Sequence, residues 1–104
     1  MRRREDRKPL AMNALCRTGA ERKTVKLWDL SSRGCRIFMT GMNLCEGQRI
    51  VLRPDGMESF DATVRWASDD FAGIEFDRPL HPAVVDHLCR LHPDEDRIAL
   101  ELAA

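Results

Sequence analysis

Apolar and polar residues alternate in short runs through the first three-quarters of the chain. The clearest run covers residues 59–67, where Phe60, Ala62, Val64 and Trp66 share one face of an extended strand. This period of two is typical of a strand that buries one side. The same pattern predicts six strands, at residues 10–16, 23–30, 35–39, 48–53, 59–67 and 71–76.

The spacing changes from two to that of a helix near residue 82. Pro82 suits a first helical turn, Val84, Leu88 and Leu91 follow at helical spacing, and Pro93 ends the pattern. We expect this helix to pack on the strands or across one open end of their sheet. A second short helical piece is predicted over residues 94–102.

Six short strands that each have one apolar face close most economically as a barrel or a tightly curled sheet. The fold class that we expect is mainly all-β, a six-stranded antiparallel barrel with a C-terminal helix. The 104 residues suffice for one domain, which we place at residues 9–104. Residues 1–8 are too polar for a core, and we expect them to form a flexible basic arm.

Charge is balanced over the whole chain but not along it. There are 17 basic and 17 acidic residues, so no overall field favours nucleic acid or a membrane surface. Residues 2–8, however, hold five basic and two acidic side chains, so attraction for anions is local to the arm. No run approaches the roughly 20 apolar residues of a membrane span, and no apolar segment follows the charged start. We expect a cytoplasmic protein without membrane insertion.

Neither cysteine chemistry nor catalysis is indicated. The four cysteines form no Cys-x-x-Cys pair, and the strand position of Cys35 and the helix position of Cys89 predict buried thiols. A zinc set of His81, His87, Cys89 and His92 matches no standard ligand spacing, so we predict no metal site. No catalytic triad, phosphate loop or carboxylate pair stands out, and we predict no enzyme and no cofactor.

Two motifs lie in a fixed order in this β pattern. Arg3 and Arg7 are four apart just before the first strand, and Asp29, Ser31 and Gly34 form a D-x-S-x-x-G turn between the second and third. This combination resembles the PilZ domain family, bacterial barrels that bind the second messenger cyclic di-GMP. The likeness extends from residue 2 to about 92 and includes Val-Arg-Trp at 64–66 and Gly-Ile-Glu-Phe at 73–76.

The resemblance implies that Arg3 and Arg7 bind the ligand, cyclic di-GMP. Cyclic di-GMP has two phosphodiesters and two guanines, and a planar guanidinium matches the O6 and N7 acceptors of guanine with parallel donors. Other arginines can neutralise the phosphates. Arg2 and Arg4 flank the motif and are either merely solvated or part of the site. An arginine in the position of Arg2 often accompanies two stacked ligands in this family, so it predicts two molecules per monomer.

The resemblance also implies roles on the barrel. Asp29 would accept hydrogen bonds from guanine N1–H and N2–H₂, where adenine has a lone pair at N1, and Ser31 would bond a base or phosphate. Gly34, which has no side chain, would let the ligand lie close to the backbone of the turn on the barrel surface. Asp29 can equally be a turn-forming side chain bonded to its own backbone. Trp66 is either an aromatic contact for the ligand or a core residue in phase with Val64.

We therefore predict a second-messenger receptor that orders its arm around cyclic di-GMP and signals to an unidentified effector protein. A ligand-independent PilZ-like adaptor is the alternative. A small barrel that binds nucleic acid is disfavoured, because it would need aromatic residues interleaved with basic ones along its strands. The chain has two Trp, four Phe and no Tyr, and its basic cluster lies off the barrel.

Overall fold

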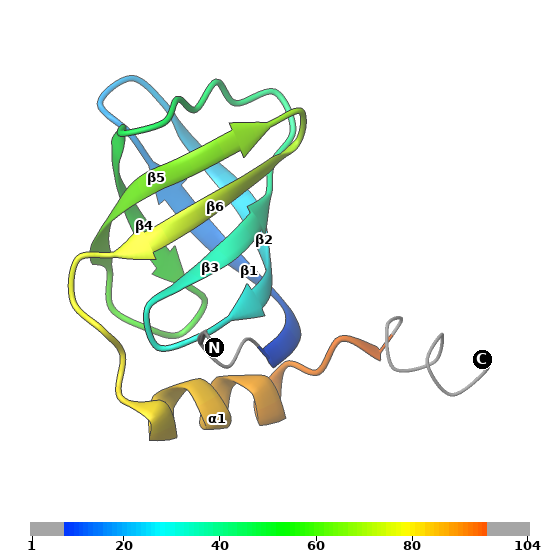
Figure 1. Cartoon of the computed structure of the whole chain (residues 1–104). Helices are drawn as coiled ribbons and strands as arrows, with labels where there is room; N and C mark the ends of the chain where they lie inside the picture. Colours follow the sequence, from blue (N-terminus) through cyan, green and yellow to red (C-terminus); the bar gives the residue numbers. More distant parts are fainter. Residues whose placement is uncertain (1–7, 96–104) are drawn as a thin grey trace, which may run out of the picture.

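A computed structural model describes residues 8–95, and in that part of the chain it shows six strands followed by one helix (Figure 1). Every strand and the helix lie within a few residues of the predicted positions. Their bounds are Lys8–Arg17 (β1), Arg22–Leu30 (β2), Gly34–Phe38 (β3), Arg49–Pro54 (β4), Phe60–Ser68 (β5), Phe71–Phe76 (β6) and Pro82–Leu91 (α1).

The strands form one closed antiparallel barrel in the order β1-β2-β3-β6-β5-β4, and β4 returns to pair with β1. Closure gives every strand two hydrogen-bonded neighbours. The predicted fold class, a six-stranded barrel with a C-terminal helix, is confirmed. Alternate side chains of each strand fill the interior, where Leu10, Leu27, Ile37, Leu52 and Val64 are almost completely buried.

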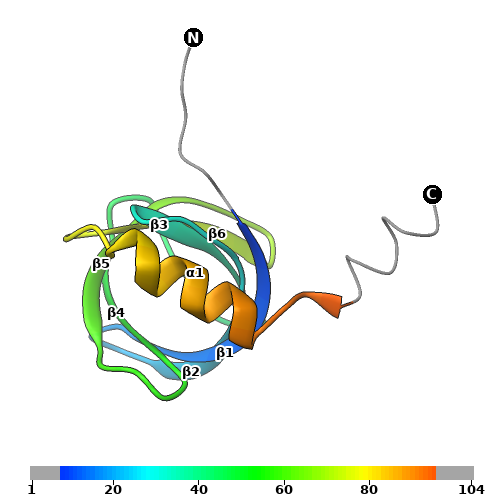
Figure 2. The ribbon, with the colours of Figure 1, turned by 90° about the horizontal axis from the view of Figure 1, so that it is seen from below.

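The helix α1 lies across one end of the barrel, as Figure 2 shows. The side chain of His81 caps its first turn by accepting a hydrogen bond from the backbone N–H of Ala83 (3.0 Å). Val85 and Leu88 face the barrel and are buried. Leu91, which we predicted on the buried stripe, is 58% exposed, and Val84 is only half-buried. The buried face of the helix therefore begins one residue later than the spacing suggested, at Val85, and ends at Leu88.

Two contacts hold the end of α1 against the beginning of β1. The backbone N–H of Ala11 donates to the carbonyl oxygen of His92 (2.9 Å), and the Lys8 ammonium pairs with the Asp86 carboxylate (2.9 Å). β1 thus begins at Lys8, one residue earlier than the predicted start of the domain. The predicted arm lies otherwise outside the described residues, as does the second helical piece from residue 96 onward.

The cysteines correct one expectation. All four are thiols; Cys16 and Cys35 are buried and Cys89 is half-buried, but Cys45 is exposed in the loop before β4. Burial raises the pKa of Cys16 to about 11, with a smaller contribution from nearby Glu21, and burial also raises the pKa of Cys89. A thiol with a raised pKa stays protonated, and therefore unreactive, at mildly alkaline pH.

This ranking predicts the order of thiol modification. At pH 8, Cys45 should react first with a thiol-specific reagent such as dithiobis(nitrobenzoate), followed slowly by Cys89, whereas Cys16 and Cys35 should react only on unfolding. Stopped-flow absorbance measures the phases, and the Cys45→Ser variant should lack the fast one. A fast phase that survives in this variant would show that another thiol is accessible.

Candidate functional site

An extra residue in β2 determines which way Asp29 faces. Leu27 pairs with Ile37 of β3, and Asp29 pairs with Arg36, the residue before Ile37. Two steps along β2 thus correspond to one step along β3, so Trp28 has no counterpart on β3 and forms a β-bulge. Without the bulge, Asp29 would have the same phase as inward-facing Leu27 and would point into the core. With it, Asp29 shares the outer face with Arg36, and Leu30 resumes the inward phase.

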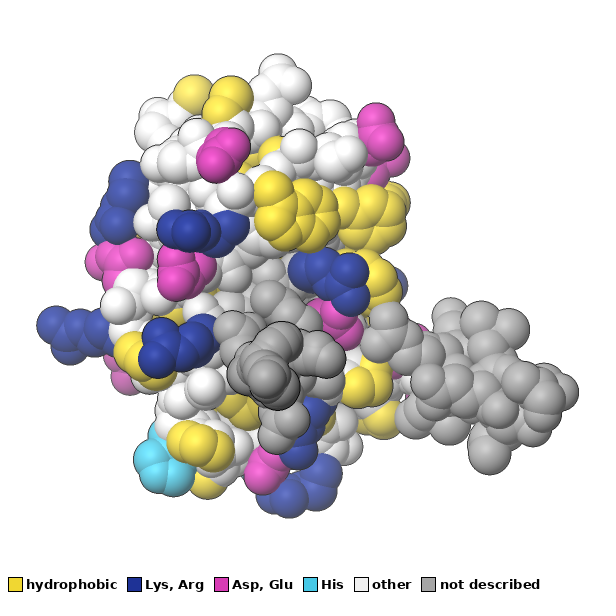
Figure 3. All heavy atoms as spheres, viewed as in Figure 1, with side chains coloured by type: hydrophobic (Ala, Val, Ile, Leu, Met, Phe, Trp, Pro, Cys, Tyr) yellow, Lys and Arg dark blue, Asp and Glu magenta, His cyan; other side chains and the backbone are white. Residues whose placement is uncertain are grey.

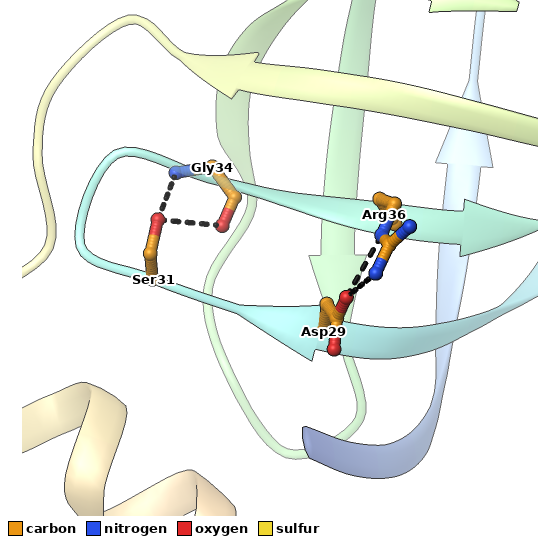
Figure 4. A network of polar contacts seen from close by, with 4 residues as sticks. All are labelled: Asp29, Ser31, Gly34 and Arg36. Atoms are coloured by element: carbon orange, nitrogen blue, oxygen red, sulfur yellow. Dashed lines mark hydrogen bonds and ion pairs between the residues drawn. The ribbon is translucent and has the colours of Figure 1, made fainter. Parts of the chain in front are cut away.

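The Asp29 carboxylate is held by Arg36 of the neighbouring strand (Figure 4). Nε of Arg36 donates to Oδ2 of Asp29 at 2.8 Å, and Nη2 bonds the same oxygen. The Arg36 guanidinium also lies over the Trp28 ring, 4.3 Å from its centroid. The Asp29 side chain is only 5% exposed, whereas that of Arg36 is 35% exposed. Arg36 is thus the outer member of this pair.

Ser31 shapes the turn that follows. Its hydroxyl accepts hydrogen bonds from the backbone N–H groups of Arg33 and Gly34, both at 3.2 Å, and donates to the Gly34 carbonyl oxygen at 3.3 Å (Figure 4). The Ser31 backbone N–H donates to that same oxygen at 2.9 Å. Ser31 is 1% exposed. A role in closing the turn is therefore visible, and direct contact with a ligand remains a prediction for this residue.

Gly34 is needed for close packing between strands. A Cβ at this position would collide with the backbone carbonyl oxygen of Ile74 on β6. The turn is also tied down from outside, because the carbonyl oxygen of Arg33 accepts from the N–H of Phe76 (2.8 Å) and that of Ser32 from the N–H of Leu80 (2.7 Å). The D-x-S-x-x-G turn is consequently fixed to β6 and to the segment that leads into α1.

A second bulge places Trp66 on the outer face. Val64 pairs with Ile74 and Trp66 with Gly73, so Arg65 is the extra residue in β5. The interpretation of Trp66 as a core residue is wrong, since its side chain is 42% exposed and covers Gly73, where a Cβ would strike the indole. Without the bulge, Trp66 would point inward like Val64; the extra residue moves it to the outer face.

The strand pairing joins these residues into one row on the outside of the barrel. Asp29 pairs with Arg36, Arg36 with Gly73, and Gly73 with Trp66, across β2, β3, β6 and β5. Next to this row is a shallow groove of about 190 Å³. Figure 3 shows hydrophobic side chains beside Lys and Arg side chains on this face. The groove is lined by Arg33, Gly34, Arg65, Trp66, Gly73, Ile74 and Glu75.

The row also reaches the start of the described chain. Pro9 pairs with Asp29 and Lys8 with Leu30, so the described chain begins directly beside the carboxylate. The structure therefore brings Asp29, Ser31 and Gly34 together at this end of the barrel, with Trp66 three strands away in the same row. The predicted arginines of the arm, Arg2, Arg3, Arg4 and Arg7, precede the described residues.

Sequence reasoning missed Arg36, the partner of Asp29. It is separated from Asp29 by seven positions across a tight turn, and the sequence alone does not establish the strand register that places the two residues opposite each other. Arg33, Arg65 and Glu75 were also missed. Glu75 pairs with Arg65 at 3.1 Å on the rim of the groove. Their exposed, polar positions gave no signal that distinguished them from ordinary surface residues.

Comparison with known proteins decides the family. The sequence profile of the PilZ domain matches residues 1–92. This chain belongs to the PilZ domain family. PilZ domains are receptor domains for cyclic di-GMP that act on effectors, and the family is not a catalytic one.

The solved structures agree on the PilZ fold. The Bacillus subtilis inhibitor of motility (MotI/DgrA) superposes with a TM-score of 0.66 at 14% identity, over 88% of this chain and 49% of that one. The chain thus spans about half the length of that neighbour. No curated protein sequence matches.

Two further observations concern the described part of the PilZ chain. Between residues 8 and 95, no helix is long and apolar enough to cross a membrane. Over the same range, His, Cys, Asp and Glu side chains nowhere gather in threes in a way that would hold a metal ion.

The packing of Gly34 leads to a stability prediction. Gly34→Ala should lower the free energy of unfolding by about 1–3 kcal/mol, because β3 must move away from β6 to admit the methyl group. Chemical denaturation measures the change. Gly19→Ala is the matched control, since nothing lies within 4 Å of the added Cβ there. Equal stability of the two variants would contradict the tight approach of β3 and β6.

Proposed function

We propose that this PilZ domain is a cytoplasmic receptor that binds cyclic di-GMP between its N-terminal arginines and the outer face of β2 and β3. The guanidinium groups of Arg3 and Arg7 bind the guanines and phosphates of the ligand, with Arg2 and Arg4 beside them. Asp29, Ser31, Gly34 and Trp66 supply the barrel side of the site. No cofactor is needed, because the ligand is bound and not converted.

The observation that carries this proposal is the place where β1 begins. Lys8 pairs with Leu30 and Pro9 with Asp29, so the arginine stretch joins the barrel at the D-x-S-x-x-G turn. Arg7 directly precedes Lys8 in sequence, and Arg3 is four residues further away. A fully extended chain spans at most about 3.3–3.6 Å per residue, so both arginines are tethered within reach of the turn.

The chemistry of the ligand matches what these two parts offer. Cyclic di-GMP has two negative charges on its phosphodiesters, and arginines can neutralise them through charge-assisted hydrogen bonds. Its guanines present acceptors at O6 and N7 and donors at N1 and N2. The carboxylate of Asp29 is an acceptor for those donors, and the exposed indole of Trp66 is a flat apolar surface.

The signal follows from fixing residues 1–7 over the turn. Ordering about half a dozen backbone residues costs roughly 6–12 kcal/mol, so several charge-assisted bonds must form together. Binding also brings negative charge to the start of β1, where Lys8 pairs with Asp86 of α1. The new surface formed by the arm, the ligand and this end of the barrel would then be read by an effector protein.

A ligand-independent adaptor is the competing function. It would use the barrel surface in both absence and presence of the nucleotide. Titration calorimetry with cyclic di-GMP separates the two, with GMP and cyclic di-AMP as control ligands. Heat of binding with cyclic di-GMP alone supports the receptor, whereas no heat with any of the three would favour the adaptor. Binding of a random oligonucleotide would favour a nucleic-acid function instead.

The arginines of the arm give the sharpest prediction. Arg3→Ala and Arg7→Ala should each weaken cyclic di-GMP binding at least tenfold, about the loss of one charge-assisted bidentate contact. The melting temperature without ligand should hardly change. Arg22→Ala is the control, because Arg22 is exposed and pairs with Arg17 at the other end of β1 and β2. Binding like the parent protein by either arm variant would remove that arginine from the site.

The same titrations give the stoichiometry. If Arg2 contributes to a stacked pair of ligands, the parent protein should bind two molecules per monomer and Arg2→Ala one. A value of one for the parent would leave Arg2 without this role.

A further inference from the structure

The exposed end of Arg36 has the geometry of a reader of guanine. Arg36 bonds Asp29 through Nε and Nη2, which occupy one edge of the guanidinium. A guanidinium has five N–H donors in a rigid plane, so its outer end still carries two parallel donors, one on each Nη atom. That end belongs to a side chain that is 35% exposed, next to the groove.

The guanidinium is fixed on two sides before any ligand arrives. Asp29 holds its edge, and the Trp28 ring lies against its face at 4.3 Å. Trp28 is itself packed against Phe71, with ring centroids 5.6 Å apart, and Phe71 against Phe38 at 5.3 Å. An arginine held in this way loses little conformational entropy on binding, which makes it a preorganised donor pair.

We propose that Arg36 binds the O6 and N7 atoms of one guanine of cyclic di-GMP, with Asp29 bracing it. This inference rests on the proposed function and adds a base-reading residue to it. The ligand has two guanines and two phosphodiesters. With one guanine on Arg36, the arginines of the arm have the other guanine and the phosphates to bind. Adenine presents an amino donor where guanine has O6, so the same fork disfavours cyclic di-AMP.

Accessibility supports Arg36 over Asp29 as the first contact. Asp29 has its Oδ2 oxygen on Arg36 and a side chain only 5% exposed, so a ligand that approaches from solvent meets the guanidinium. The next residue in the row, Gly73, has no side chain, and Trp66 lies over it. A base on Arg36 would therefore have the indole of Trp66 beside it, over the neighbouring strand β6.

The first test uses substitutions of Arg36. Arg36→Met keeps an unbranched apolar side chain but removes the charge and all donors, and Arg36→Lys keeps the charge but lacks the two parallel N–H donors. Both should weaken cyclic di-GMP binding about tenfold, the discrimination of one bidentate contact. Arg49→Met is the matched control, because Arg49 also contacts a carboxylate with two nitrogens, that of Asp77, on the outside of the barrel.

A second measurement compares two ligands on the same folded protein. Cyclic di-GMP in which both guanines are 7-deazaguanine lacks both N7 acceptors. The parent protein should bind this analogue more weakly than cyclic di-GMP, and in Arg36→Lys the ratio of the two affinities should shrink about tenfold, since one of the two forks is already lost. Calorimetry gives both affinities, and circular dichroism checks the fold of each variant.

The outcomes separate this inference from the proposed function. If the parent protein binds cyclic di-GMP but Arg36→Lys binds it equally well, or if the analogue ratio does not change, the inference is overturned and the receptor function stands. If Arg36→Met and Arg49→Met weaken binding alike, Arg36 acts only through stability, and the inference is again overturned. If the parent protein does not bind cyclic di-GMP, the proposed function fails first.

Discussion

The side chains of a strand alternate between its two faces, and in a small closed barrel one face is the core. A carboxylate two residues after an inward-facing leucine would therefore be buried among apolar atoms, at a cost of several kcal/mol for an unpaired charge. The bulge at Trp28 resolves this conflict by moving Asp29 to the outer face. The bulge at Arg65 does the same for Trp66 on β5. The candidate site depends on these two interruptions of the regular pattern.

The Asp29 side chain lies on the outer face of the barrel but is still buried, so its negative charge requires a partner. Arg36 supplies it from the directly opposing position on β3, and the Trp28 ring shields one face of the guanidinium. Such a pair contributes little net stability, because pairing mainly offsets the desolvation of both charges. Its effect is to fix orientation. The packed rings of Trp28, Phe71 and Phe38, the Asp29–Arg36 ion pair and the turn closed by Ser31 together form a fixed surface. This surface lies where the arginine stretch joins the barrel.

The sequence predicted the parts of this molecule that follow regular periods. The six strands and the helix are visible in the spacing of apolar residues, and the turn motif is visible as residue types at fixed separations. Trp66 was left ambiguous because a single extra residue changes the phase of all that follows, and no residue type marks it reliably. Arg36 was missed because the strand register that places it opposite Asp29 is not visible in the sequence. The available sign was Asp29, a charged residue in the same phase as the inward-facing Val25 and Leu27. The capping role of His81 was hidden as well, since histidine is an uncommon residue at that position.

The closed ring of strands also limits how any other molecule can recognise this domain. Each of the six strands already pairs with two neighbours, although β4 pairs only with the last four residues of β1. A partner protein therefore meets no strand in residues 8–95 with a whole free edge, which disfavours the addition of a further strand, a mode of peptide capture that relies on main-chain hydrogen bonds. Selection of an effector must come from side-chain chemistry and shape, so changes in a few surface residues can redirect the domain to a new partner while the barrel stays as it is.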